Sequence, residues 1–91
     1  MFRAECIVTL KRAINDPEGS TIRSALHALG FGQVDDVRAG KFLELTLDVD
    51  DRAQAQAMAE AMAAELLANS VIEDYRITLT QIEAPAGAGA T

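Results

Sequence analysis

The sequence holds one cysteine, Cys6, and one histidine, His27, so any nucleophile–base pair would have to use these two. A catalytic set requires its members to converge. Cys6 shares the apolar parity of an alternating segment, whereas His27 falls off the apolar stripe of a helical one. We therefore expect Cys6 to pack in the core and His27 to be solvated. A single cysteine rules out an intrachain disulfide, and one Cys with one His makes a zinc site unfavourable.

Carboxylates are plentiful, but they do not form a recognisable site. The adjacent pairs at 35–36, 50–51 and 73–74 fall at the ends of expected strands and helices, where acids are usually solvated or cap a helix. No loop has EF-hand spacing. Arg38 and Lys41 flank Gly40 and could hold an anion, or pair with nearby acids or a partner protein. We predict no catalytic residue, no metal site and no cofactor bound by this chain.

The stretch NDPEGSTIRSALHALGF at 15–31 raises the question of phosphate binding at a helix N-terminus. Asp16 suits the N-cap position and Pro17 the first helical position. Glu18 in the first turn adds a charge that would oppose a phosphate. The stretch lacks GxxxxGK[ST] and GxGxxG. Its pattern therefore predicts plain helix capping.

Charge and hydropathy exclude several classes of partner. The net charge is −6, which disfavours phosphate backbones and anionic lipid surfaces. No apolar run approaches the roughly 20 residues of a membrane span. The N-terminus, MFRAECIVTL, has no signal-peptide pattern and passes directly into alternation. We expect a cytoplasmic protein with neither a nucleic acid nor a membrane partner.

Hydrophobic periodicity predicts the elements that position these residues. Alternation indicates strands, and apolar residues at i, i+3, i+4, i+7 indicate helices, with Asp50 or Asp51 capping the second helix. An Ala/Gly/Pro-rich tail, which we expect to be disordered, closes the chain. The expected elements are a strand at 2–10, a helix from 17 to about 29, a β region at 33–49, a helix at 51–68, a strand at 72–82 and the tail at 83–91.

This order predicts one α+β domain over residues 1–82, related to ferredoxin-like folds, with two helices on one face of an antiparallel sheet. The β region at 34–49 is either a hairpin turning at Gly40 or one long strand, and the unbroken parity from Val37 to Val49 favours the long strand. The opposite sheet face would carry mixed polar and apolar side chains. These are Arg3, Glu5, Ile7, Thr9, Phe42, Glu44, Thr46, Arg76, Thr78 and Thr80.

Four segments within about residues 2–82 carry a family resemblance: LKRAINDPEG at 10–19, ALHALGF at 25–31, DVRAGKFLEL at 36–45 and LLANSVIEDY at 66–75. In this order and separation they show a resemblance to the PurS family, the small subunit of phosphoribosylformylglycinamidine (FGAM) synthase in purine biosynthesis. It implies a non-catalytic chain that bridges a synthase subunit, PurL, and a glutaminase subunit, PurQ, and assists ammonia transfer between them. It also implies a homodimer or homotetramer, with ATP and Mg²⁺ on the large partner.

The two most specific segments supply the candidates for partner contact. They lie in the middle β region and at the entry to the last strand, and they are Asp36, Arg38, Gly40, Lys41, Asn69, Glu73, Asp74 and Tyr75. Two other functions remain as alternatives. One is an amino-acid-binding regulatory module of the ACT type, which binding of an amino acid by the isolated chain would favour. The other is an acylphosphatase-like hydrolase, although the glycine-rich loop ending in arginine is missing after the first strand.

A domain of this length has a thin core, and self-association would supplement it. We predict that the open sheet face packs on a second copy of the chain. The measurement is the mass in solution at micromolar concentration, by light scattering. A mass of one chain would contradict the prediction.

Overall fold

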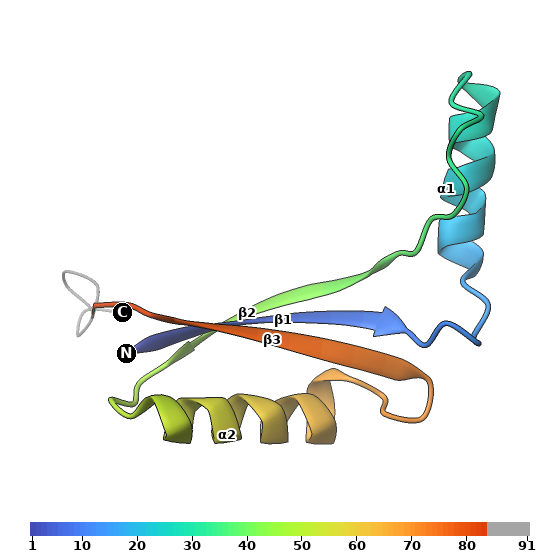
Figure 1. The fold of residues 1–91 in the computed structure, drawn as a ribbon. Coiled ribbons are helices and arrows are strands. Elements are labelled where there is room, and N and C mark those ends of the chain that lie inside the picture. The colour runs from blue at the N-terminus through green and yellow to red at the C-terminus, as the bar shows by residue number, and fades with distance from the viewer. Residues whose placement is uncertain (84–91) are drawn as a thin grey trace.

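The computed structural model describes residues 1–83, which form a three-stranded antiparallel sheet and two helices (Figure 1). In chain order the elements are β1 (Phe2–Leu10), α1 (Pro17–Ala28), β2 (Gly40–Leu47), α2 (Arg52–Met62), its π-helical extension η1 (Ala63–Leu67) and β3 (Glu73–Gln81). The strand order is β2-β1-β3. The predicted α+β class, the antiparallel sheet and the two helices are confirmed.

The central strand β1 pairs antiparallel with both of the other strands. Val8 lies opposite Lys41 on one side and Tyr75 on the other, and Phe2 lies opposite Leu47 and Gln81. The predicted parity of β1 holds, because its even-numbered residues from Phe2 to Val8 face α2 and are almost fully buried, while Leu10 at the strand end is half-buried. Their exposed fractions are 2% for Phe2, 1% for Ala4, 1% for Cys6 and 0% for Val8.

Helix α2 covers this face of the sheet and packs close to it, because its buried side chains are small (Figure 1). Ala55 and Ala59 are buried against Phe2 and Ala4. Of the two predicted caps, Asp51 holds the position, and its carboxylate accepts a hydrogen bond from the backbone N–H of Gln54.

The spacing of Ala55, Met58, Ala59, Met62 and Leu66 predicts one apolar stripe on this helix. The stripe fails most clearly in the last turn, where Leu66 is 83% exposed. The backbone N–H of Ala68 donates to the carbonyl of Ala63, five residues back, so η1 is wound more loosely than an α-helix. The looser turn rotates later residues around the axis, and Ala63 and Leu67 pack on the sheet instead.

Helix α1 does not lie on the sheet. Figure 1 shows it projecting away beyond the end of β1, so the expectation of two helices on one face is met by α2 alone. Gly19 is the only buried residue of α1, while Ile22 and Leu29 on its apolar stripe stay exposed. The predicted Asp16 cap and Pro17 start are confirmed, and Gly30, with φ of 100°, follows the end of the helix.

The β region at 33–49 forms neither a hairpin nor one long strand. Only Gly40–Leu47 pairs with β1, and residues 34–39 run back along α1 as an irregular segment (Figure 1). Parity alone could not reveal this, because the backbone groups of this segment bond to α1 and its N-cap rather than to a strand.

The predicted tail at 83–91 lies outside the described residues except for Glu83, so the domain boundary at residue 82 stays a prediction. Within residues 1–83, no helix is long and apolar enough to cross a membrane.

The close approach of α2 to the sheet can be tested with a matched pair of substitutions. Ala59 is 1% exposed and faces the sheet, whereas Ala61 lies on the exposed side of the same helix. We expect Ala59→Leu to lower the free energy of unfolding by about 1–3 kcal/mol through overpacking. Ala61→Leu should change it by less than about 0.5 kcal/mol. Urea unfolding at one protein concentration measures both, and equal effects would contradict this packing.

Candidate interface at the loop end of the sheet

The eight candidate residues gather at one end of the sheet. Gly40 and Lys41 begin β2 beside Thr9 and Val8 of β1, and Asp74 and Tyr75 lie beside the same two residues on the other side. We call this region the loop end, made up of residues 8–16, 34–41 and 67–75. It unites the two specific segments of the sequence, 36–45 and 66–75, although 20 residues separate them along the chain.

Arg38 ties the loop end together from inside. Its Nη2 donates to the carbonyl oxygens of Lys11 at 2.9 Å and Ile14 at 2.8 Å, and it lies 3.5 Å from that of Leu10. Lys11 and Ile14 belong to the turn that follows β1, and Leu10 is the last residue of that strand. One guanidinium thus holds a whole turn in place, and a change at Arg38 would disturb the fold as well as any partner contact.

Asp16 makes the second tie. Its carboxylate accepts hydrogen bonds from the backbone N–H of Gly19 at 2.9 Å and of Ala39 at 2.7 Å, and the residue is 5% exposed. The bonds from Gly19 and then Ala39 lower the pKa of the Asp16 carboxyl below its usual value, and the positive charge of Arg38 lowers it further. The irregular segment 34–39 packs tightly against the start of α1, since a Cβ added to Gly19 would lie 2.0 Å from the carbonyl oxygen of Val37.

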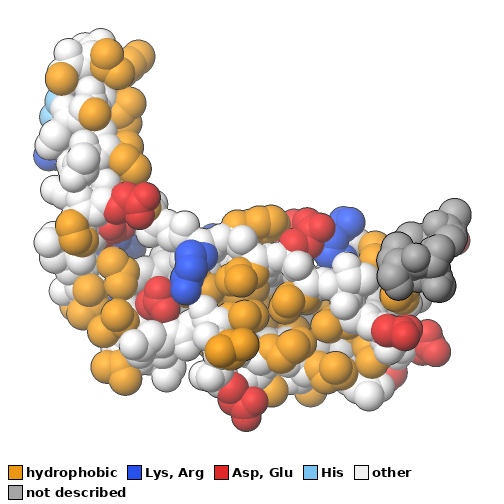
Figure 2. Space-filling view, turned by 180° about the vertical axis from the view of Figure 1, so that it is seen from behind, with side chains coloured by type: hydrophobic (Ala, Val, Ile, Leu, Met, Phe, Trp, Pro, Cys, Tyr) orange, Lys and Arg blue, Asp and Glu red, His pale blue; other side chains and the backbone are white. Residues whose placement is uncertain are grey.

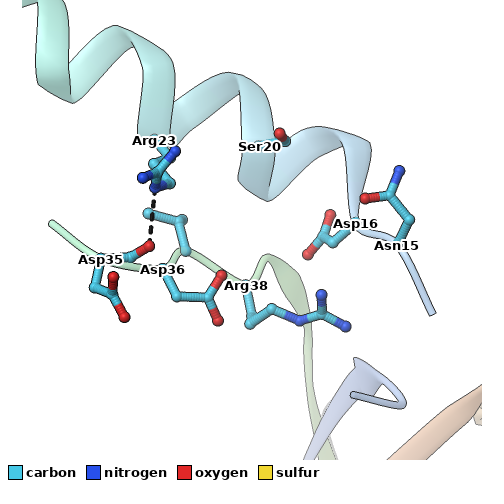
Figure 3. A pocket seen from close by; sticks show the side chains of 8 residues that line it. Asn15, Asp16, Ser20, Arg23, Asp35, Asp36 and Arg38 are labelled. Atoms are coloured by element: carbon cyan, nitrogen blue, oxygen red, sulfur yellow. Dashed lines mark hydrogen bonds between the residues drawn. The ribbon is translucent and has the colours of Figure 1, made fainter. Parts of the chain in front are cut away.

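Further along α1, two side chains reach the same segment. The Nε of Arg23 donates to the carbonyl of Asp35 at 2.8 Å, drawn as a dashed line in Figure 3. The Nε2 of His27 lies 2.7 Å from the carbonyl oxygen of Val34, so His27 is not simply solvated as predicted. These contacts continue from Asp16 along the helix. The sequence did not predict these contacts because their acceptors are backbone carbonyls, which every residue type has.

Three of the candidates are exposed and charged. Asp36 pairs with Arg12 at 3.4 Å and Asp74 with Lys11 at 2.9 Å, while the Nζ of Lys41 lies 3.4 Å from the carbonyl oxygen of Leu67. Exposed pairs of this kind contribute about 0–1 kcal/mol to stability. Their charges therefore remain available to a partner surface.

The other candidates have structural roles in this chain. Glu73 accepts from the backbone N–H of Asn69 at 2.7 Å, and the Asn69 side chain accepts from the N–H of Val71, which closes the turn before β3. Tyr75 packs on the core cluster beneath η1. At Gly40 an added Cβ would lie 2.4 Å from the carbonyl oxygen of Val8, so glycine allows β2 to start close to β1.

The loop end offers charged and hydrogen-bonding groups around a hollow. A hollow of about 270 Å³ lies between α1 and residues 35–38, and Figure 3 shows Asp16, Arg23, Asp36 and Arg38 around it. Its Arg23 is already bonded to a backbone carbonyl, and no histidine or cysteine lines it. Among residues 1–83, no three His, Cys, Asp or Glu side chains are grouped so as to hold a metal ion. Cys6 is buried far from this hollow, and burial raises the pKa of its thiol.

Apolar side chains form a second kind of contact surface. Figure 2 shows them along α1 and over the region where the sheet meets α2. Leu29 is 72% exposed and Phe31 is 55% exposed at the tip of α1, and on the open sheet face Phe42 is 58% exposed beside Ile7. Exposed large apolar groups in such numbers are typical of surfaces that other protein chains cover.

Comparison with known proteins matches residues 3–81 to the family model of PurS, phosphoribosylformylglycinamidine (FGAM) synthase. The chain belongs to the PurS family. It is 40% identical over 84 residues to the FGAM synthase subunit PurS of Bacillus subtilis, a match that covers 92% of this chain and 99% of the relative.

Solved structures agree with the family. The crystal structure of Methanocaldococcus jannaschii PurS, 37% identical, matches with a TM-score of 0.82 over 91% of this chain and 100% of the other. A chain from the structure of PurLQS of Thermotoga maritima, 26% identical, matches with a TM-score of 0.78 over 88% of this chain and 99% of that one. The predicted ferredoxin-related fold of PurS is thereby confirmed. Which residues of this PurS chain contact a partner stays a prediction.

Asp16 offers a test by pH. Its folded pKa is lowered, so its stabilising effect is present above the usual Asp pKa of about 3.9 and is lost as the pH falls through the lower folded value. We expect Asp16→Asn to lower the urea midpoint at pH 7, because the new amide group cannot accept from both N–H groups. The difference from the unsubstituted chain should shrink below about pH 4.

The matched control is Asp50→Asn, at an exposed position beside the second helix cap. It should leave the midpoint unchanged at both pH values. A gap between Asp16→Asn and the unsubstituted chain that is as wide at pH 3 as at pH 7 would contradict the assigned role of the carboxylate.

Proposed function

We propose that this chain is the PurS subunit of an FGAM synthase that also contains a PurL-like synthase and a PurQ-like glutaminase. The observation that carries the proposal is the match to a chain in the PurLQS structure over nearly its whole length. The enzyme is a glutamine-dependent ligase of purine biosynthesis. It converts formylglycinamide ribonucleotide, glutamine and ATP into formylglycinamidine ribonucleotide, glutamate, ADP and phosphate.

In this assembly the chain works as an adaptor without a catalytic residue of its own. The two exposed surfaces support that role. The loop end offers exposed charged side chains. Helix α1, which projects from the sheet, and the open sheet face together offer exposed apolar side chains. One surface can meet a second copy, giving a homodimer or homotetramer, while the other meets PurL or PurQ. The projecting arm increases the separation that a single small chain can bridge.

The protonation of ammonia in water explains why the two enzymes need an adaptor. Free ammonia in water near pH 7 is mostly protonated, and the ammonium ion is not a nucleophile. A glutaminase must therefore deliver ammonia to the synthase inside a closed complex. A chain that holds both enzymes in register raises their effective concentration and excludes water from the transfer.

Cofactors belong to the large partner in this proposal. ATP and Mg²⁺ act on the PurL-like subunit, and this chain binds neither. A role in purine biosynthesis supports placement in the cytoplasm.

The test is product formation by the matching PurL-like and PurQ-like subunits with and without this chain. With glutamine we expect the chain to raise the rate at least about tenfold, since linking binding partners raises apparent affinity by about 10²–10⁴. With ammonium chloride in place of glutamine, the rate should be the same with and without the chain.

The ammonium reaction is the matched control, because it uses the same synthase but needs no transfer. An equal glutamine-dependent rate without this chain would reject the adaptor role. A gain with both nitrogen sources would instead indicate an effect on the synthase alone.

A further inference from the structure

A second hollow at the loop end is lined by arginines. It measures about 320 Å³, and its lining residues are Thr9, Leu10, Arg12, Arg38 and Arg76. The chain has only 8 Lys and Arg residues against 14 Asp and Glu, yet three of its arginines surround this space and no carboxylate lines it. A cluster of like charges is unfavourable by itself, so it points to an anionic ligand.

Three separate parts of the fold bring these arginines together. Arg12 stands in the turn after β1, and Arg38 comes from the irregular segment before β2. Arg76 belongs to β3, where it lies opposite Ile7 on the sheet face that α2 leaves open. The guanidiniums therefore approach the hollow from different elements, and the hydrogen bonds of Arg38 to the turn fix one of them.

Most of the donors around the hollow are free to bind. Arg38 uses only Nη2 for the backbone, and within residues 1–83 its Nε and Nη1 have no hydrogen-bond partner. Arg76 has no ion pair or side-chain hydrogen bond in the same range. Two acids of the loop end form exposed pairs, Asp36 with the Nη1 of Arg12 at 3.4 Å and Asp74 with Lys11 at 2.9 Å. Within residues 1–83 the Nε and Nη2 of Arg12 have no hydrogen-bond partner, so Arg12 also keeps donors for a ligand.

We propose that this arginine hollow binds the phosphate group of a small molecule. A phosphate monoester presents three terminal oxygens, which can accept from three guanidiniums at once, with the Thr9 hydroxyl as a further donor. A carboxylate has two oxygens and leaves one arginine unmatched. The lining has no carboxylate to hold Mg²⁺, so the site takes phosphate without a metal.

This site is separate from the N-terminus of α1, where the Asp16 carboxylate already accepts from the N–H of Gly19. Every lining residue belongs to this one chain, and the proposal requires that a second copy packed on the open sheet face leaves Thr9 and Arg76 accessible. The isolated chain should therefore bind the ligand without its partner subunits.

The experiment is an NMR titration of the arginine Nε–H signals of the chain with inorganic phosphate and, separately, with ribose 5-phosphate. Sodium chloride holds the ionic strength constant. We expect saturable shifts at Arg12, Arg38 and Arg76. Arg76→Gln should weaken binding about tenfold, as expected for the loss of one charged hydrogen-bond donor.

Arg3→Gln is the matched control, since it removes the same charge from the same sheet face, at the opposite end of β1. It should leave the dissociation constant unchanged. Backbone amide spectra check that both variants fold, and Arg12→Gln repeats the test should Arg76→Gln unfold.

Three outcomes would overturn the proposal. Shifts that rise linearly with phosphate would indicate general ionic effects, and so would equal weakening by Arg3→Gln and Arg76→Gln. Saturation by a glutamate-rich peptide but not by either phosphate compound would show that the hollow receives a carboxylate-bearing protein segment instead.

Discussion

The arrangement of this chain depends on one carboxylate, that of Asp16. It accepts from the N–H of Gly19, which starts α1, and from the N–H of Ala39, which precedes β2. The Asp16 carboxylate thereby holds together two segments that are distant in sequence. Next to it, the Arg38 guanidinium holds the turn after β1 through hydrogen bonds to backbone carbonyls. The position of α1 relative to the sheet, the shape of the loop end and the two hollows all follow from these bonds.

A chain with this construction suits an adaptor. Its fully buried core is built mainly from β1, Leu47 and small alanines, and nine large apolar side chains of the described residues remain exposed. Such a core holds the backbone in place but leaves exposed apolar surface that another chain can cover. In a subunit of a larger enzyme, neighbouring chains bury the apolar surface that the small domain cannot bury by itself.

Local rules predicted the local features well. Alternation placed β1, and the Asp16–Pro17 pair placed the start of α1, because capping depends on residues a few positions apart. The rest depends on long-range contacts. The course of residues 34–39 and the direction of α1 are set by bonds to backbone carbonyls, which any residue type offers. Leu66 was misplaced because a single loose turn rotates the helix surface. The sequence supplied the partner-contact candidates as two separate segments, but it did not predict that they meet at one end of the sheet.

The position of β1 in the sheet has a consequence for how the protein is made. Of the three described strands, the central one is synthesised before the other two, and its neighbour β3 lies at residues 73–81. The sheet therefore cannot close until nearly the whole chain has been synthesised, and folding relies on contacts of long sequence separation, which form slowly. Until then Phe2 and Val8 can be covered only by β2, α2 and η1, and one edge of β1 lacks its partner strand. The nascent chain must be protected from aggregation for the duration of its own translation.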